Sequence, residues 1–230
     1  MSTLAPEQAK NHRIEINGYA IVSDDDRIAG PDGLIPASLR NEKDWDCFQR
    51  ALAGSNLVVL GHRSHELAPN VRGDQRLVIS RGAAGLEQHA NVWWWNPARR
   101  SWLEVAKELL PRGGDVAVPG GQVVFDLFLK IGFDAFHLTR AHGVRLPGGR
   151  ALFSGCDAGL SAEAVLAGAG LRLSEKSCSM RSMASTSASG AQSPRPTPRG
   201  AKSVNRGRID PFATSRRMNV FARRRRPEST

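Results

Sequence analysis

The sequence predicts an α/β domain in which helices flank a mostly parallel central sheet, followed by a tail without a packed core. Short apolar segments of strand length alternate with segments of helical apolar spacing between residues 14 and 176. Two apolar segments run directly into glycines, as the strand-to-helix turns of βα units do. From about residue 177 onward, Ser, Arg and Pro dominate and the apolar periodicity stops.

The first expected elements are a strand, a loop and a helix. Ile14–Val22 reads as a strand, and the Asp, Gly and Pro residues of 24–33 predict a long loop. Asn41 can cap a helix, with Asp44 three residues later reaching back to the cap. The apolar positions of this helix follow helical spacing: Trp45, Phe48 and Leu52. Further strands are expected at Leu57–Leu60, Arg76–Ser80 and Asn91–Trp95.

The second half of the domain continues this alternation. Asn96-Pro97 predicts a helix start, and an apolar stripe follows it through residues 102–110. A strand at Val116–Val118 then turns at Pro119-Gly120-Gly121 into a helix that includes Phe128. The remaining elements are a strand, a helix and a strand, at Ala135–Thr139, Leu160–Ala167 and Leu171–Leu173.

Charge supports the same boundaries. Segment 177–230 contains 12 of the 32 Lys and Arg residues and 2 of the 22 Asp and Glu residues, which leaves 20 of each in residues 1–176. The formal net charge of +10 therefore resides in the tail. We predict a flexible N-terminus at 1–13, a folded domain at 14–176 and a disordered basic tail at 177–230. The tail cannot bury enough apolar surface to offset the entropy of ordering.

The N-terminus and the cysteines indicate a cytoplasmic protein. Met1–Arg13 is polar and lacks the apolar stretch of a signal peptide, and no run reaches the length of a membrane-spanning helix. The three cysteines contain no C-x-x-C pair, and their odd number gives no disulfide framework. His62 and His65 have no third ligand nearby in the sequence, so we expect no metal site.

Two glycine turns carry the functional argument. One strand ends in Gly61-His62-Arg63-Ser64 and another in Pro119-Gly120-Gly121-Gln122. Missing side chains let the backbone approach a phosphate, and the start of the following helix directs free N–H groups at it. Arg63 adds a cation that could hold a ribose phosphate. No G-x-G-x-x-G is present, so this is not the Rossmann fingerprint.

The order of these segments resembles the dihydrofolate reductase-like superfamily. Its first loop, acidic helix, G-R-x-T-x-E turn, L-S-R strand end and I-G-G turn are similar, in that order, to residues 26–36, 44–48, 58–66, 78–81 and 118–121. Residues 133–138 and 148–153 look more like the reductase domain of riboflavin biosynthesis, in the same superfamily. The resemblance covers roughly residues 14–175.

The resemblance implies NADPH as hydride donor. It places the cofactor on three turns: Gly61, His62, Arg63, Ser64, Ser80, Arg81, Gly120, Gly121 and Gln122. It places a flat heterocycle near Ile35 and Phe48, with Asp44 as the catalytic carboxylate that orients the ring and favours its protonated form. Glu42 and Asp46 are alternatives for this carboxylate, and Asp44 could instead complete the helix cap.

Three functions remain open at this stage. The first is NADPH-dependent reduction of a pteridine or pyrimidine-type heterocycle. The second is the reductase step on a ribosylaminopyrimidine in riboflavin biosynthesis, whose phosphate would call for cations near the substrate. The third is a degenerate, non-enzymatic binding module whose basic tail binds nucleic acid. Under either of the two enzymatic functions, we expect a small-molecule heterocycle as substrate and no membrane partner. Nucleic acid would be contacted only through the tail, and the chain could form a homodimer.

The tail carries one further expectation. Superfamily members usually continue after a strand like Leu171–Leu173 with a last strand that pairs into the sheet. Residues 177–230 resemble a translation in a shifted reading frame, and Pro194, Pro196 and Pro198 lack donors for a sheet. We therefore expect a missing last strand, an exposed sheet edge and a weakened fold.

Overall fold

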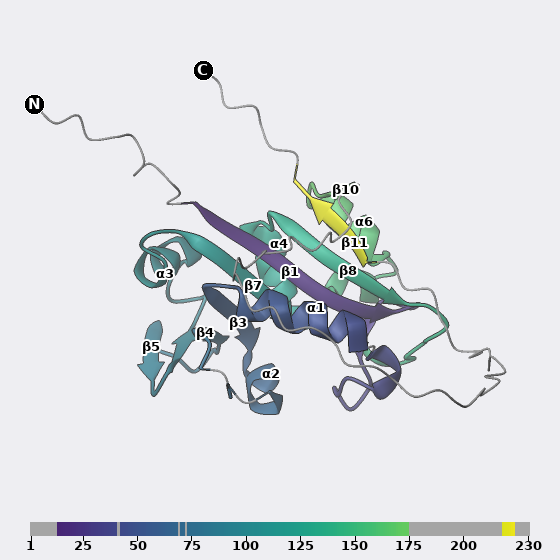
Figure 1. Cartoon of the computed structure of the whole chain (residues 1–230), viewed down its shortest axis with the longest axis horizontal. Coiled ribbons are helices and arrows are strands. Elements are labelled where there is room, and N and C mark those ends of the chain that lie inside the picture. Colours follow the sequence, from purple (N-terminus) through teal and green to yellow (C-terminus); the bar gives the residue numbers. More distant parts are fainter. Residues whose placement is uncertain (1–12, 41, 69, 72, 175–217, 224–230) are drawn as a thin grey trace, which may run out of the picture.

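A nine-stranded sheet forms the centre of the structure (Figure 1). The computed structural model describes residues 13–40, 42–68, 70–71, 73–174 and 218–223. In sheet order the strands are β10 (Arg172–Ser174), β11 (Met218–Ala222), β8 (Ala135–Ala141), β1 (Ile14–Ser23), β7 (Gly114–Gly120), β3 (Leu57–Gly61), β4 (Arg76–Ile79), β6 (Val92–Trp95) and β5 (Leu86–His89). The strands from β8 to β6 run parallel, and antiparallel pairs close both sides. The predicted α/β fold with a mostly parallel sheet is confirmed.

Helices cover both faces of the sheet (Figure 1). α1 (Glu42–Ala53) lies in front of β1 and β7, and α4 (Gln122–Ile131) and α6 (Ala162–Gly168) lie behind the sheet. The other elements are α2 (His62–Leu67), α3 (Trp102–Leu109), α5 (Ser154–Asp157), a 3-10 turn at Ala37–Leu39, and a ribbon of β2 (Arg27–Ala29) with β9 (Arg150–Ala151). Among the described residues, no helix is long and apolar enough to cross a membrane.

Aromatic packing fixes α4 against the sheet. The helix buries Val124, Phe125 and Phe128 because they recur at helical spacing. Phe125 packs edge-to-face on Phe136 of β8 with ring centroids 5.4 Å apart, and Phe128 packs on Trp102 of α3 at 5.2 Å. Such pairs add about 0.5–1.5 kcal/mol beyond the area they bury. The start of α4 is thereby held at the carboxyl end of β7.

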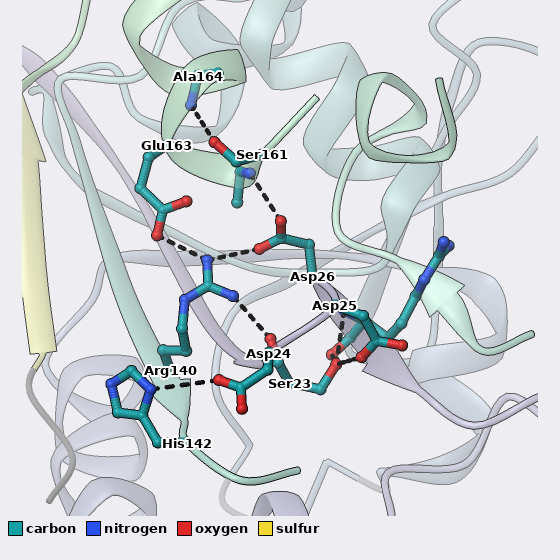
Figure 2. Close-up of polar contacts among 11 residues, drawn as sticks. Ser23, Asp24, Asp25, Asp26, Arg140, His142, Ser161, Glu163 and Ala164 are labelled. Carbon is teal, nitrogen blue, oxygen red and sulfur yellow. Dashed lines mark hydrogen bonds and ion pairs between the residues drawn. The ribbon is translucent and has the colours of Figure 1, made fainter. Parts of the chain in front are cut away.

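A partly buried ion cluster connects the loop after β1 to the rest of the domain. Figure 2 shows Arg140 of β8 between the carboxylates of Asp26 and Glu163, each 2.7 Å away. Burial alone would lower the pKa of Arg140, but the hydrogen bonds to Glu163 and Asp26 raise it, so the guanidinium stays charged. The two aspartates before Asp26 accept backbone N–H bonds from Gly143 and Leu146. The segment predicted as a turn-rich loop is therefore anchored at its start.

The helix start expected at Asn96-Pro97 is wrong. α3 begins after Ser101, whose hydroxyl accepts from the Glu104 N–H while the Ser101 N–H donates to the Glu104 carboxylate. Asn96 is buried, and its amide donates to the carbonyls of Arg81 at 2.9 Å and Ala83 at 3.0 Å. A buried amide must find hydrogen-bond partners, and here the turn after β4 supplies them.

The expectation of a missing last strand is also wrong. β11, the yellow arrow in Figure 1, lies between β10 and β8 and pairs antiparallel with both. Its Val220 and Phe221 are 9% and 6% exposed. Five residues suffice for this strand, and the prolines that cannot donate to a sheet lie outside it. The prediction of a disordered tail is therefore wrong for residues 218–222. A missing last strand no longer supports the frame-shift hypothesis. Residues 177–217 and 224–230 of the predicted tail, and residues 1–12 of the predicted flexible N-terminus, lie outside the described residues.

If β11 completes the core, Phe221→Ala should lower the free energy of unfolding by about 3 kcal/mol or more. The buried ring lies opposite Phe136 in the register with β8. Leu173→Ala on neighbouring β10 is the control, since Leu173 is 63% exposed and its loss should cost about 0.5 kcal/mol or less. Urea denaturation measures both. Equal effects of the two substitutions would mean that β11 is not part of the folded core.

Candidate functional site

The three predicted cofactor turns lie side by side at one edge of the sheet. β7, β3 and β4 are parallel neighbours, with Leu60 opposite Gly120 and Gly61 opposite Ile79. Because the carboxyl ends of parallel strands meet at one edge, the turns at Gly61, at Ser80 and at Gly120 become neighbours. Residues that are about 60 positions apart in the sequence thus form one surface.

The turn before α4 leaves open space above Gly121. Gly120 has a φ of +106°, and a Cβ at this position would lie 2.4 Å from the Phe125 ring. Apart from the adjacent residues Gly120 and Gln122, a Cβ on Gly121 would meet no atom within 4 Å. Gly121 caps α4, whose first N–H groups have no acceptor within the helix. The backbone and the core therefore require glycine at 120, whereas glycine at 121 keeps the approach to these N–H groups clear.

The turn before α2 differs from the prediction in what Arg63 contacts. Its guanidinium donates to the carbonyl of Asp32 and lies against Gly33, whose φ is +77°. Arg63 thus joins α2 to the loop after β2, yet the residue as a whole remains exposed. His62 pairs with Glu66 one turn later at 3.6 Å. The exposed guanidinium keeps further N–H donors that could bind an anion while this contact stays in place.

A hollow of about 180 Å³ adjoins the predicted Ser80-Arg81 turn. It is lined by Ser80, Gly82, Ala83, Glu87, His89 and Trp94. The Ser80 hydroxyl accepts from the Gly82 N–H at 3.2 Å, and Arg81 is exposed. Trp94 forms an aromatic wall that the rings of His62 and His65 meet edge-on, at 5.2 and 5.6 Å between centroids. The hollow therefore combines an aromatic face with a polar rim.

A cavity of about 220 Å³ adjoins the start of α4. It is lined by Gly30, Pro31, Gln122, Gly148, Gly149, Arg150, Ala151 and Asp157. The Gln122 amide donates to the Asp157 carboxylate at 2.7 Å, and Arg27 pairs with the same carboxylate. Hydrogen bonds from Arg27 and then Gln122 lower the pKa of Asp157, which is therefore ionised at neutral pH.

Asp157 belongs to this cavity without any local signal in the sequence. Its partners Gln122 and Arg27 lie 35 and 130 positions away, so no short spacing links them. The cavity's Gly148-Gly149-Arg150 segment enters the sequence prediction only through the family resemblance. These residues join the site because β2 and β9 pair next to the start of α4.

The structure describes only some of the side chains predicted to bind the substrate. Asp44 lies in the first turn of α1, one turn before Phe48, as the spacing predicts. The side chains of Asp44 and of the alternative Glu42 lie outside the described residues, and so does the predicted cap at Asn41. Asp46 is exposed, and Phe48 is half-buried against the neighbouring tryptophan. Ile35 is 46% exposed in the loop that Arg63 contacts.

The mostly parallel sheet and the glycine turns at its carboxyl edge form an α/β fold that can be compared with known proteins. No protein-family model and no curated protein matches the chain. Among solved structures, a Shewanella sp. PV-4 protein provisionally named for riboflavin biosynthesis is 16% identical, with a TM-score of 0.56 over 92% of this chain and 100% of its own. Dihydrofolate reductase from Enterococcus faecalis, complexed with NADP(H) and RAB-propyl, is 18% identical, with a TM-score of 0.47 over 60% of this chain and 76% of its own. The fold that the sequence resemblance predicted is confirmed.

The two neighbouring glycines should respond differently to valine. Gly120→Val forces a side chain into a positive φ and into the Phe125 ring, so we expect a loss of about 3 kcal/mol or more in the free energy of unfolding. Gly121→Val has a negative φ of −44° and meets no atom outside the adjacent residues, so it should cost about 1 kcal/mol or less. Chemical denaturation compares them. Equal destabilisation would contradict the assignment of Gly121 to an open approach.

Proposed function

We propose that the chain is an NADPH-dependent reductase acting on a pteridine or pyrimidine-type heterocycle. The observation that carries the proposal is the meeting of the turns at Gly61, Ser80 and Gly120-Gly121 at one sheet edge, with open space above Gly121. Neighbouring strands lie about 4.8 Å apart, so the span from β7 to β4 is about 10 Å. An extended dinucleotide can place its diphosphate at one end of this span and a ribose at the other.

The residues present fit such a cofactor. A Cβ at 121 would fill the approach that a phosphate needs, and glycine leaves it clear. The first N–H groups of α4 and the exposed Arg63 offer positive charge to a diphosphate, and Ser80 and Arg81 offer a hydroxyl and a cation to a ribose phosphate. The bound nicotinamide would supply the hydride, while the protein supplies orientation and electrostatics.

Asp44 is the carboxylate that we propose for the substrate side. In the first turn of α1 it can accept hydrogen bonds from a ring N–H and an exocyclic amine together. Its negative charge then favours the protonated ring, which accepts hydride more readily. Phe48, one turn later, and Ile35 of the loop would contact the faces of the heterocycle.

A phosphorylated ribosylaminopyrimidine, as used in riboflavin biosynthesis, is the second candidate substrate. The observation that favours it is the presence of cations around the loop that carries Ile35: Arg63 contacts this loop, and Arg40 is exposed after the 3-10 turn that follows it. The likeness in fold to the Shewanella protein agrees with this candidate. A binding module that grips nucleic acid through the basic tail is the non-enzymatic alternative, and it predicts no NADPH oxidation with either class of substrate.

The test of the proposed function is NADPH oxidation in the presence of pteridines and ribosylaminopyrimidines. Asp44→Asn should retain NADPH binding and lose most of the turnover, because the amide keeps the shape and loses the charge. Glu42→Gln and Asp46→Asn are matched controls on the same helix and should remain active. Normal turnover by Asp44→Asn, with loss in either control, would reject Asp44. A wild-type chain that oxidises NADPH with none of the heterocycles would reject the reductase function.

A further inference from the structure

A single carboxylate joins three segments beside the proposed cofactor site. Asp157 ends α5, and its two oxygens take different partners. One oxygen accepts from Gln122, the first residue of α4, at 2.7 Å. The other accepts from Arg27, the first residue of β2. No described contact other than Asp157 links the side chains of Gln122 and Arg27.

The same junction shapes the cavity of about 220 Å³. Arg27 also donates to the carbonyl of Gly149 at 3.2 Å, and its side chain is only 21% exposed. Gly149 packs so closely on β2 that a Cβ there would lie 2.4 Å from the carbonyl of Ala29. Gln122 and Asp157 both line the cavity, next to Gly121. The walls of the cavity therefore come from α4, from the ribbon of β2 and β9, and from α5, and these segments are joined by the carboxylate of Asp157.

The position of the Gln122 side chain depends on its hydrogen bond to Asp157. Bound to Asp157, the Gln122 amide lies along the cavity wall, at the end of α5. Without that acceptor, the long and flexible amide is free to turn back over the start of α4. There it would cover the N–H groups that a phosphate would use.

We infer that Asp157 is a positioning residue of the proposed cofactor site, which holds Gln122 away from Gly121 and β2 against α5 so that the phosphate approach stays open. The inference rests on the proposed function. It goes beyond that function by assigning a role to Asp157, which contacts the second glycine turn only through the side chain of Gln122.

Charge alone predicts the opposite effect on cofactor binding. Removing a negative group from beside Arg27 and Arg150 would tighten the binding of an anionic dinucleotide if only long-range electrostatics mattered. A positioning role predicts weaker NADPH binding in Asp157→Asn. In the wild type, Arg27 and Gln122 each donate to their own carboxylate oxygen, whereas the asparagine side chain has only one oxygen acceptor. The sign of the change separates the two explanations.

The experiment measures the dissociation constant of NADPH for the full chain by titration calorimetry. Asp157→Asn should weaken binding about five- to tenfold, with a matching rise in KM and little change in kcat. Glu108→Gln is the matched control, since it removes a similarly exposed ion pair between Glu108 of α3 and Arg100, away from the site. This variant should bind NADPH as wild type does. Gln122→Ala tests the route of the effect: combined with Asp157→Asn it should weaken binding by less than the product of the two single effects. Unchanged or tighter binding by Asp157→Asn, or fully multiplicative effects, would overturn the inference.

Failure of the proposed function gives a different result, because wild type would then bind no NADPH at all. In that case, hydrogen exchange of wild type and Asp157→Asn tests, without any cofactor, whether Asp157 holds α4 and β2 in place. Faster exchange of the first turn of α4 and of β2 in Asp157→Asn, but not in Glu108→Gln, would support it. Identical exchange in wild type and Asp157→Asn would overturn it.

Discussion

The parallel pairing of β7, β3 and β4 is the constraint on which the rest of the site depends. Parallel strands must all leave the sheet at the same edge, so the turns that follow them converge whatever the distance between them in the sequence. The observed register sets Leu60 opposite Gly120 and Gly61 opposite Ile79. A register shift of one residue on β3 would turn its fully buried side chains to the opposite faces and would displace Gly61 from its neighbours.

Charged groups then arrange the loops around this edge. The Arg140 cluster is partly buried, and removing one partner would leave a partly desolvated charge unpaired. It fixes where the loop after β1 begins, whereas the more exposed contacts of Arg27 with Asp157 and of Arg63 with the Asp32 carbonyl hold the loop farther along.

The sequence alone is sufficient to predict features that depend on neighbouring residues in the chain. Alternating apolar segments locate most of the parallel strands within one or two residues, because burial on both faces requires continuous apolar runs. The glycines at the ends of β3 and β7 identify the candidate cofactor turns. Asn96 misleads because its local environment suits a helix cap, while its buried amide is satisfied by the turn after β4. Asp157 escapes prediction because its partners come together only when the ribbon of β2 and β9 forms.

The last strand shows a different limit of local reasoning. Composition averaged over 177–230 is basic and rich in Ser and Pro, and this average hides the five residues of β11. The strand is stabilised by pairing on both sides, with β10 and with β8, and by the burial of Phe221. None of these contacts can be read from the segment itself.

The thermal shift caused by NADPH tests the central claim most directly, namely that the glycine turns form a dinucleotide site. At a concentration of NADPH about 100 times its Kd, binding should stabilise the wild-type chain by about 2.7 kcal/mol, or about 5–10 °C in Tm. We expect a smaller shift with NADH and none with Gly121→Val, whose side chain would block the phosphate approach. An unchanged Tm for wild type in millimolar NADPH, or an equal shift in Gly121→Val, would contradict the account.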